Sequence, residues 1–295
     1  MKIAIIGAGK WGQALFHAFK EKNDCVITSR TPRDIDGFVS LDVALRYPYL
    51  VMTIPAQEVR GWMEKNFKDN GQSILVAAKG IEIKSGAFLN DVYEAFIDGQ
   101  RLAFLSGPSF SAEVQKSLPT ALVVSSKNKT LSQEFCDALP EFIKGYASSD
   151  VTGEEVAGAY KNVIAIAGGV SDGLSLGNNA RAALLARGLV EMSRFGMSFG
   201  AKQDTFLSLG GAGDLFLTAS SNMSRNYRVG FMLSKGKNID DILKELGEVA
   251  EGVPTAKALY DIAQKENIYL PIAKEVYNML YEGKDPRKSV KDLLG

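Results

Sequence analysis

A glycine-rich turn directly after an apolar segment is the feature of this sequence that most limits its fold. Residues 2–6 (KIAII) are apolar after Lys2 and partly β-branched, which is typical of a buried parallel strand, and the next six residues are GAGKWG. In such a turn Gly7 permits the tight bend, Gly9 lets a pyrophosphate approach the backbone, and Gly12 lets the next helix pack closely against the strand. Residues 13–22 carry apolar side chains at helical spacing. The order of strand, glycine turn and helix predicts a dinucleotide-binding site, whereas the glycine pattern alone would also suit an ordinary tight turn.

Later apolar segments predict that this turn opens a larger α/β domain. Segments of apolar and β-branched residues alternate with helical patterns up to about residue 150. The predicted strands are residues 25–28, 49–54, 73–78 and 101–105, with short extra strands at 120–125 and 142–147. Strands that alternate with helices indicate a Rossmann-type, doubly wound and mainly parallel sheet, in which ligands bind outside the carboxyl ends of the strands.

Beyond residue 150 the pattern changes to long helical segments without a convincing strand. A length of 295 residues also suits about two domains. We therefore predict a dinucleotide-binding domain at residues 1–150 and an all-α, substrate-binding and catalytic domain at residues 151–295.

The charge balance and the cysteine content narrow the classes of partner. The chain has 34 basic and 34 acidic residues, so net charge favours neither nucleic acid nor an anionic membrane as the main partner. No apolar stretch is long enough to span a bilayer, and Cys25 and Cys136 have neither metal-site spacing nor a disulfide framework. We expect a cytoplasmic protein with a small-molecule partner, no nucleic acid and no membrane insertion. The sequence does not fix the oligomeric state, for which a homodimer is one option.

The residue after the second predicted strand bears on the choice of cofactor. An NAD-specific site usually places an acidic residue about 20 residues after the glycines, where it holds the ribose hydroxyls. This chain has Arg30 there, and a guanidinium can accept a ribose 2′-phosphate. We expect NADPH/NADP as the cofactor, with NADH/NAD kept open by Asp34 and Asp36. The alternative for Arg30 is a solvated turn residue.

Two further polar residues follow predicted strands at the edge of the sheet where ligands bind. Lys79 comes after the fourth predicted strand and Ser109 after the fifth. The alternative for Lys79 is an exposed loop lysine. The alternative for Ser109 is the N-cap of a helix, which propensity alone favours.

A lysine in an apolar helix is the best candidate for proton transfer. Residues 156–170 have only Lys161 and Asn162 as strongly polar side chains, which predicts a helix buried on all sides. Lys161 shares its helical face with small residues that leave room for a ligand or another backbone, and a buried lysine must be paired or neutralised. We weigh this equally against a lysine that extends to the surface. Because the one histidine, His17, lies on the first helix, Lys161 is the best-placed acid/base, with Asp214 as a plausible partner.

Two polar segments of the second half are candidates for binding an anion. Residues 208–214 (SLGGAGD) deliver the carboxylate of Asp214 from a glycine turn. Residues 222–230 (NMSRNYRVG) group hydroxyl, guanidinium and amide donors, namely Ser224, Arg225, Asn226 and Arg228. Such a group suits a phosphate, although composition alone favours a polar surface loop.

Taken in order, the motifs resemble those of one enzyme family. The series runs GAGKWG, AAKGIE at residues 77–82, SGPSF at 106–110, AYKNVIAIAGG at 159–169, GGAGDL at 210–215, SRNYRVG at 224–230 and VAEGVPTA at 249–256. It closely resembles bacterial-type NAD(P)-dependent glycerol-3-phosphate dehydrogenase and covers nearly the whole chain. The resemblance implies hydride transfer between a nicotinamide and glycerone phosphate, giving sn-glycerol 3-phosphate for phospholipid synthesis.

The resemblance also implies roles for individual residues. The family's proton-accepting lysine matches Lys161, and the lysine that touches both substrate and cofactor matches Lys79. The family's other substrate contacts match Gly107, Ser109, Asp214, Ser224, Arg225 and Asn226. Its cofactor contacts match Gly7, Gly9, Gly12, Lys10, Trp11, Arg30, Arg225, Val249 and Glu251. Ser111, which we also assign to the cofactor, stands where the family commonly has alanine.

Two other functions would share the dinucleotide fingerprint. A 3-hydroxyacyl-type dehydrogenase should lack the group formed by Ser224, Arg225 and Asn226, and it usually works through histidine. A non-catalytic dinucleotide sensor would need no lysine in the buried helix. Both fit the sequence less well.

Overall fold

The computed structural model describes residues 1–294 and divides into two compact units. The first unit contains Met1–Ala78 and Leu89–Val151, and the second contains Lys79–Phe88 and the chain from Thr152 onward. This division differs from two consecutive domains at one place. The short segment Lys79–Phe88 leaves the first unit and belongs to the second.

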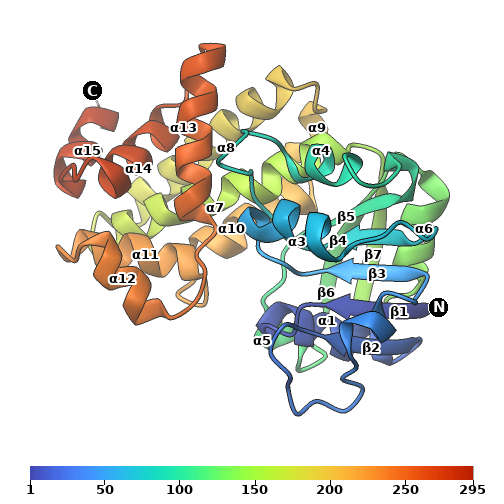
Figure 1. The fold of residues 1–295 in the computed structure, drawn as a ribbon. Coiled ribbons are helices and arrows are strands. Elements are labelled where there is room, and N and C mark those ends of the chain that lie inside the picture. Colours follow the sequence, from blue (N-terminus) through green and yellow to red (C-terminus); the bar gives the residue numbers. More distant parts are fainter. Residues whose placement is uncertain (295) are drawn as a thin grey trace. The chain divides into compact units, whose positions relative to one another are not determined.

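Seven strands of the described chain form one sheet in the first unit (Figure 1). They are β1 (Lys2–Ile6), β2 (Asp24–Thr28), β3 (Tyr49–Met52), β4 (Ser73–Val76), β5 (Leu102–Ser106), β6 (Thr120–Ser125) and β7 (Ile143–Ser148). Their order is β2-β1-β3-β4-β5-β6-β7, and every neighbouring pair is parallel except β5 with β6. The predicted Rossmann-type, mainly parallel sheet is confirmed, and each predicted strand is present.

Strand β1 illustrates why the sheet needs cover on both faces. Its residues from Ile3 onward are all buried, although side chains along a strand point alternately to opposite faces. Ile3 and Ile5 share a hydrophobic cluster with Leu15 and Phe19 of α1 (Lys10–Lys20). The other helices of this unit are α2 (Leu41–Ala44), α3 (Val59–Asn66), α4 (Leu89–Glu94), α5 (Ser111–Val114) and α6 (Lys129–Asp137).

The sheet topology places the glycine turn at a crossover point. Strand β1 pairs with β2 on one side and with β3 on the other, so the chain changes direction across the sheet after β2. Gly7 follows β1 directly, and its N–H donates to the carbonyl oxygen of Thr28 at 2.8 Å. In doubly wound sheets ligands bind outside the carboxyl ends of the strands at such a point.

The second unit is helical. Its helices are α7 (Val151–Gly173), α8 (Gly177–Ser198), α9 (Gln203–Phe206), α10 (Asp214–Ala219), α11 (Arg225–Ser234), α12 (Ile239–Leu246), α13 (Gly252–Glu266), α14 (Pro271–Tyr281) and α15 (Pro286–Leu294), and a π-helical turn, η3 (Leu209–Gly213), precedes α10. No strand follows β7 within residues 149–294, in agreement with the predicted all-α second half.

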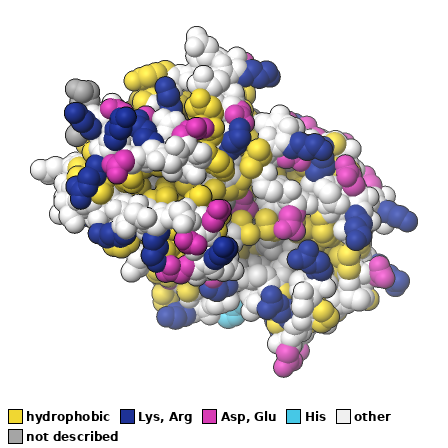
Figure 2. Space-filling model, turned by 60° about the vertical axis from the view of Figure 1, so that its left-hand side comes forward, with side chains coloured by type: hydrophobic (Ala, Val, Ile, Leu, Met, Phe, Trp, Pro, Cys, Tyr) yellow, Lys and Arg dark blue, Asp and Glu magenta, His cyan; other side chains and the backbone are white. Residues whose placement is uncertain are grey.

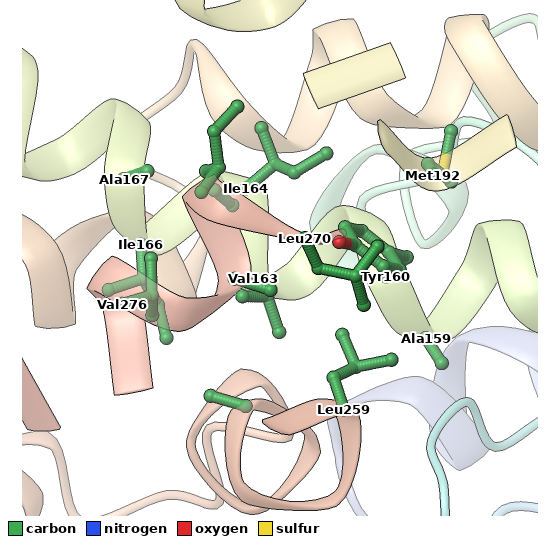
Figure 3. Close-up of a cluster of buried hydrophobic side chains, with 14 of the residues drawn as sticks. Ala159, Tyr160, Val163, Ile164, Ile166, Ala167, Met192, Leu259, Leu270 and Val276 are labelled. Carbon is green, nitrogen blue, oxygen red and sulfur yellow. The ribbon is translucent and has the colours of Figure 1, made fainter. Parts of the chain in front are cut away.

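Helix α7 forms the centre of this helical unit. Tyr160, Val163, Ile164 and Ile166 are completely buried, and Figure 3 shows them among side chains contributed by other helices, such as Leu259. A helix whose apolar residues extend around its circumference must be enclosed by neighbours to remain stable in water. The prediction of a buried helix over this stretch is confirmed.

Glycines let α11 approach α7 closely. A Cβ atom at Gly169 would overlap the carbonyl oxygen of Tyr227, and one at Gly230 would overlap the carbonyl oxygen of Ile166. The small residues on α7 therefore accept the backbone of another helix along this part of its length.

Charged side chains of both signs are interspersed on the face shown in Figure 2, in keeping with the balanced composition. Attraction for a small anion must therefore come from a local group of charges. Among the helices of residues 1–294, none combines the length and apolar character needed to cross a membrane.

Candidate active site

The glycine turn has the steric properties that a bound pyrophosphate requires. Gly7 has φ of +114°, a conformation that side-chain-bearing residues rarely adopt, and a Cβ at Gly12 would overlap the carbonyl oxygen of Gly7. Thr53 donates its hydroxyl to the carbonyl oxygens of Ile6 and Gly7, at 3.0 Å each. A Cβ at Gly9, the N-cap of α1, would meet no atom within 4 Å. Open space in front of the amide groups of a helix N-terminus fits a dinucleotide phosphate, whose binding here stays a prediction.

Two of the three predicted cofactor residues nearest this turn have side chains at the surface. Lys10 opens α1 and is exposed, and Arg30 is exposed two residues after β2. Trp11 donates its indole N–H to the carbonyl oxygen of Ala77, at the end of β4, at 3.1 Å. The indole N–H is thus committed to the sheet, and any contact of Trp11 with a cofactor would use its ring.

The SGPSF segment ends β5 and leads into α5. Gly107 has φ of +107°, and a Cβ there would lie 3.0 Å from the carbonyl oxygen of Ala121. The N-cap of α5 is Phe110, so Ser109 does not have the capping role that propensity favoured. Ser109 is half-buried, and Ser111 is the first residue of α5. Their predicted contacts with substrate and cofactor stay predictions.

Lys161, Asp214 and Lys79 form a buried charge cluster inside the helical unit. The Nζ of Lys161 donates to Oδ1 of Asp214, and the Nζ of Lys79 donates to Oδ2 of the same carboxylate at 2.6 Å. Lys161 and Asp214 are only 7% and 1% exposed. The structure thus contradicts the alternative in which Lys161 extends to the surface, because its ammonium group is buried and paired with a carboxylate.

Thr218 is a fourth member of this cluster that the sequence reasoning missed. Its hydroxyl accepts a hydrogen bond from the Nζ of Lys161 at 3.0 Å and donates to Oδ1 of Asp214 at 3.2 Å. Thr218 follows Asp214 by four residues, which puts both side chains on one face of α10. A hydroxyl at that spacing from a carboxylate, in the otherwise apolar segment DLFLTA, is the signal that could have identified it.

Lys79 reaches the cluster because its segment is anchored in the helical unit. Ile81 is fully buried in the hydrophobic cluster of this unit, and Phe88 lies edge-on to Phe199 with ring centroids 5.3 Å apart. The stem of Lys79 lies against Gly158 of α7, where an added Cβ would come within 3.1 Å of its Cδ atom. The exposed-loop alternative for Lys79 is wrong, since its side chain is 19% exposed and ion-paired.

Burial and the neighbouring charges shift the pKa values of the cluster. Burial is the largest effect and lowers the pKa of Lys161, Asp214 raises it, and the positive charge of Lys79 lowers it, which together bring the pKa from the usual 10.5 to about 7. Burial alone would raise the pKa of Asp214, but the two lysines outweigh burial and hold its pKa below the usual value. With Asp214 ionised and both lysines protonated, the three groups carry one net positive charge. Such a cluster can exchange a proton near neutral pH and attract an anion.

The predicted phosphate-binding residues have three different environments. Ser224 is the buried N-cap of α11, and its hydroxyl accepts from the N–H of Tyr227 at 3.2 Å. Asn226 is also buried and bridges two elements, donating to Oδ1 of Asn162 and accepting from the N–H of Gly252, both at 2.9 Å. Arg225 is exposed. The group is therefore more than a polar surface loop, which is the alternative that composition favoured.

The remaining predicted residues lie before α13 or in the first unit. Val249 is exposed, and Glu251 precedes α13, where its carbonyl oxygen accepts from the N–H of Thr255 at 3.1 Å. His17 lies in the first unit, with Nε2 2.9 Å from the hydroxyl of Ser117. This hydrogen bond is consistent with a structural role for His17.

Comparison with known proteins connects this site to one family. Family models described as NAD-dependent glycerol-3-phosphate dehydrogenase N-terminus and C-terminus match residues 29–132 and 150–291. Glycerol-3-phosphate dehydrogenase (NAD(P)+) from Sulfurimonas denitrificans is 59% identical over 293 residues, covering 99% of both chains. The corresponding enzyme from Campylobacter lari is 58% identical over 294 residues, covering 100% of this chain and 98% of its own.

Solved structures agree with these sequence matches. A crystal structure of glycerol-3-phosphate dehydrogenase from Coxiella burnetii superimposes with a TM-score of 0.91 at 33% identity, covering 99% of this chain and 98% of that one. The enzyme from Saccharomyces cerevisiae, at 21% identity and a TM-score of 0.81, shares the fold. Since the family models match both halves and the relatives span almost the whole length, the chain belongs to the NAD(P)-dependent glycerol-3-phosphate dehydrogenase family of oxidoreductases.

Proposed function

We propose that this enzyme interconverts glycerone phosphate and sn-glycerol 3-phosphate with Lys161 as general acid and base. The observation that carries the proposal is the buried Lys161 ammonium, which shares the carboxylate of Asp214 with Lys79. The nicotinamide nucleotide supplies or accepts the hydride. Lys161 gives a proton to the carbonyl oxygen during reduction and takes it back from the alcohol during oxidation.

The hydrogen bonds of Lys161 suit this role. An ammonium group has three N–H donors, and Asp214 and Thr218 accept two of them. The third is available for a substrate oxygen. Because the pKa of Lys161 is about 7, both its acidic and its basic form are populated near neutral pH, as a group working in both directions requires. Asp214 and Thr218 hold the amine in place, and burial, opposed by Asp214 and assisted by Lys79, lowers its pKa.

Arg225 is our candidate anchor for the substrate phosphate. Its guanidinium is 44% exposed at the start of α11, where charge-assisted hydrogen bonds and the helix N-terminus both favour a dianion. Ser224 and Asn226 support this end of the helix, the first by capping it and the second by joining it to Asn162. Gly107 and Ser109 of the first unit are proposed as further substrate contacts.

We propose that the cofactor is NADPH, with NADH as a second option, bound at the glycine turn. Arg30 is exposed after β2 and available for a 2′-phosphate, whereas Asp36 forms an ion pair with Lys20 at 2.6 Å and is less suited to hold ribose hydroxyls. The further cofactor contacts that we propose are Lys10, Trp11, Lys79, Ser111, Val249 and Glu251. In this scheme residues 1–150 form the dinucleotide-binding domain, apart from Lys79–Phe88. Residues 151–295 form the substrate-binding and catalytic domain, to which Lys79–Phe88 also belongs.

The cellular context follows from the proposed reaction. Glycerol 3-phosphate made by this enzyme would supply the headgroup precursor of phospholipids in the cytoplasm. Cys25 and Cys136 are both buried free thiols, which suits a reducing compartment. We propose a homodimer as the assembly, which the mass in solution, measured by light scattering after size-exclusion chromatography, would test.

One set of assays tests the activity. Purified enzyme is mixed with NADPH or NADH and with glycerone phosphate or a 3-oxoacyl-CoA, and cofactor oxidation is followed, while cofactor binding is measured without substrate. We expect turnover with glycerone phosphate alone. Turnover with the acyl-CoA would indicate a 3-hydroxyacyl-type dehydrogenase, and binding without turnover would indicate a sensor.

A further inference from the structure

The guanidinium of Arg225 already has a carboxylate beside it. Oε2 of Glu248 lies 3.6 Å from Nη1 of Arg225, and the two side chains are 30% and 44% exposed. This separation is longer than a good charge-assisted hydrogen bond, so the pair is electrostatic and open to solvent. A phosphate that binds Arg225 would therefore lie close to the negative charge of Glu248 and be repelled by it.

The backbone keeps Glu248 close to Arg225. Glu248 lies between α12 and α13, directly after Gly247, which ends α12 with φ of +61°. At the other end of this connection, the N–H of Gly252 donates to Oδ1 of Asn226, the residue next to Arg225, at 2.9 Å. A Cβ at Gly252 would lie 2.6 Å from the carbonyl oxygen of Asn162, so the connection is tightly packed against α7 as well. The connection that carries Glu248 is therefore fixed to α11 at Gly252 by contacts that do not depend on the ion pair.

We propose that Glu248 competes with the substrate phosphate for Arg225 and so sets how tightly the substrate binds. This inference rests on the proposed role of Arg225 as the phosphate anchor. In the free enzyme the carboxylate neutralises part of the guanidinium charge. A phosphate dianion, with more charge and a second oxygen for bidentate binding, displaces it. Glu248 thus lowers the affinity for every anion that binds Arg225.

The variant Glu248→Gln removes the charge and keeps the shape of the side chain. We expect the KM for glycerone phosphate to fall by roughly two- to fivefold, the size of effect that a solvent-exposed ion pair can have, with the change in KM rather than in kcat. Competitive inhibition by inorganic phosphate should strengthen by a similar factor. Inhibition by acetate should strengthen as well, because the cost of displacing Glu248 does not depend on which anion displaces it.

Glu245→Gln is the matched control. Glu245 lies on α12, three residues before Glu248, and pairs with Lys237 at 2.5 Å, so its variant makes the same change in net charge without touching Arg225. We expect it to leave KM and both inhibition constants unchanged. If Glu248→Gln behaves like Glu245→Gln, or if it raises KM, the competition is refuted.

Arg225→Ala separates this inference from the proposed function. If Arg225→Ala raises KM and also abolishes the effect of Glu248→Gln in the double variant, both are supported. If Arg225→Ala raises KM but Glu248→Gln still lowers it in the double variant, Glu248 acts through another group and the inference fails while the anchor stands. If Arg225→Ala leaves KM unchanged, the assignment of Arg225 as phosphate anchor fails, and the inference fails with it.

Discussion

Replacing Lys161 with methionine should stop the reaction without unfolding the protein. Methionine has nearly the length of lysine and suits the buried surroundings of α7. After the replacement, Asp214 still has Lys79 at 2.6 Å and the hydroxyl of Thr218 at 3.2 Å. Its buried carboxylate therefore keeps a positive partner, which avoids the large cost of an isolated buried charge. We expect the variant to fold and to bind NADPH.

The loss of activity should be large because, in the proposed mechanism, no other group is placed to donate the proton to the substrate. A positioned general acid or base contributes about a hundredfold to ten-thousandfold in rate, or roughly 3 to 5.5 kcal/mol of activation free energy. Turnover of glycerone phosphate with NADPH and of glycerol 3-phosphate with NADP should both fall by such a factor. NADPH binding, measured by fluorescence titration, should change little. A variant that keeps more than about a tenth of the turnover would rule out Lys161 as the acid/base.

The pH dependence gives this prediction a direction. Reduction needs the ammonium form of Lys161, so its rate should fall as the pH rises through about 7, whereas oxidation needs the amine and its rate should rise over the same range. Lys79→Met removes a positive charge that lowers the pKa of Lys161, so both transitions should move to higher pH. In Lys161→Met both transitions should disappear. If Lys79→Met abolishes them and Lys161→Met keeps them, the roles of the two lysines are exchanged.

Other residues give further tests of the site and the fold. Arg30→Asp should shift the ratio of kcat/KM for NADPH and NADH toward NADH, and an unchanged ratio would exclude Arg30 from cofactor selection. Arg225→Ala should lower kcat/KM for glycerone phosphate by about tenfold to a hundredfold, the effect of losing hydrogen bonds to a charged group, and near-normal kinetics would remove it from the site. Gly169→Ala should reduce the free energy of unfolding by at least about 2 kcal/mol, because its Cβ overlaps the backbone of α11. Gly61→Ala in α3, where a Cβ meets no atom within 4 Å, should instead be neutral or stabilising by up to about 1 kcal/mol, and equal effects of the two substitutions in urea denaturation would refute the packing argument.

Much of the fold could be predicted because the apolar segments and the glycine turn are local features of the sequence. Segment 3–6 is continuously apolar since a parallel strand covered on both faces buries the side chains on both of its sides, and the glycines that follow are required by one turn. The same holds for α7, where an apolar circumference predicted burial. The antiparallel pairing of β5 with β6 has no such local signal, because the apolar pattern of a strand does not depend on the direction of its neighbour.

The site was harder to predict where it depends on contacts between distant segments. Lys161 stood out as a cation in an apolar helix, and Asp214 was its expected partner. Nothing local indicates that Lys79 leaves the sheet with its segment to share the same carboxylate, since that depends on how Ile81 and Phe88 pack in the helical unit. Asn226 as a substrate contact stays a prediction, and nothing local indicated that its amide also joins Asn162 and Gly252.

The sharing of one carboxylate by two lysines explains how a single cluster can meet two requirements. If each lysine had its own buried carboxylate, the added attraction would raise the pKa of Lys161 toward the usual value of 10.5, and the ammonium would give up its proton too rarely for oxidation. If Lys79 were absent, Lys161 and Asp214 would form a neutral pair with little attraction for a phosphorylated substrate. One carboxylate for two lysines leaves one positive charge in excess. In the proposed mechanism that charge adds to burial, the larger effect, in lowering the pKa of Lys161 into the working range, and it also favours the dianionic substrate, so both contributions should be lost together when Lys79 is removed.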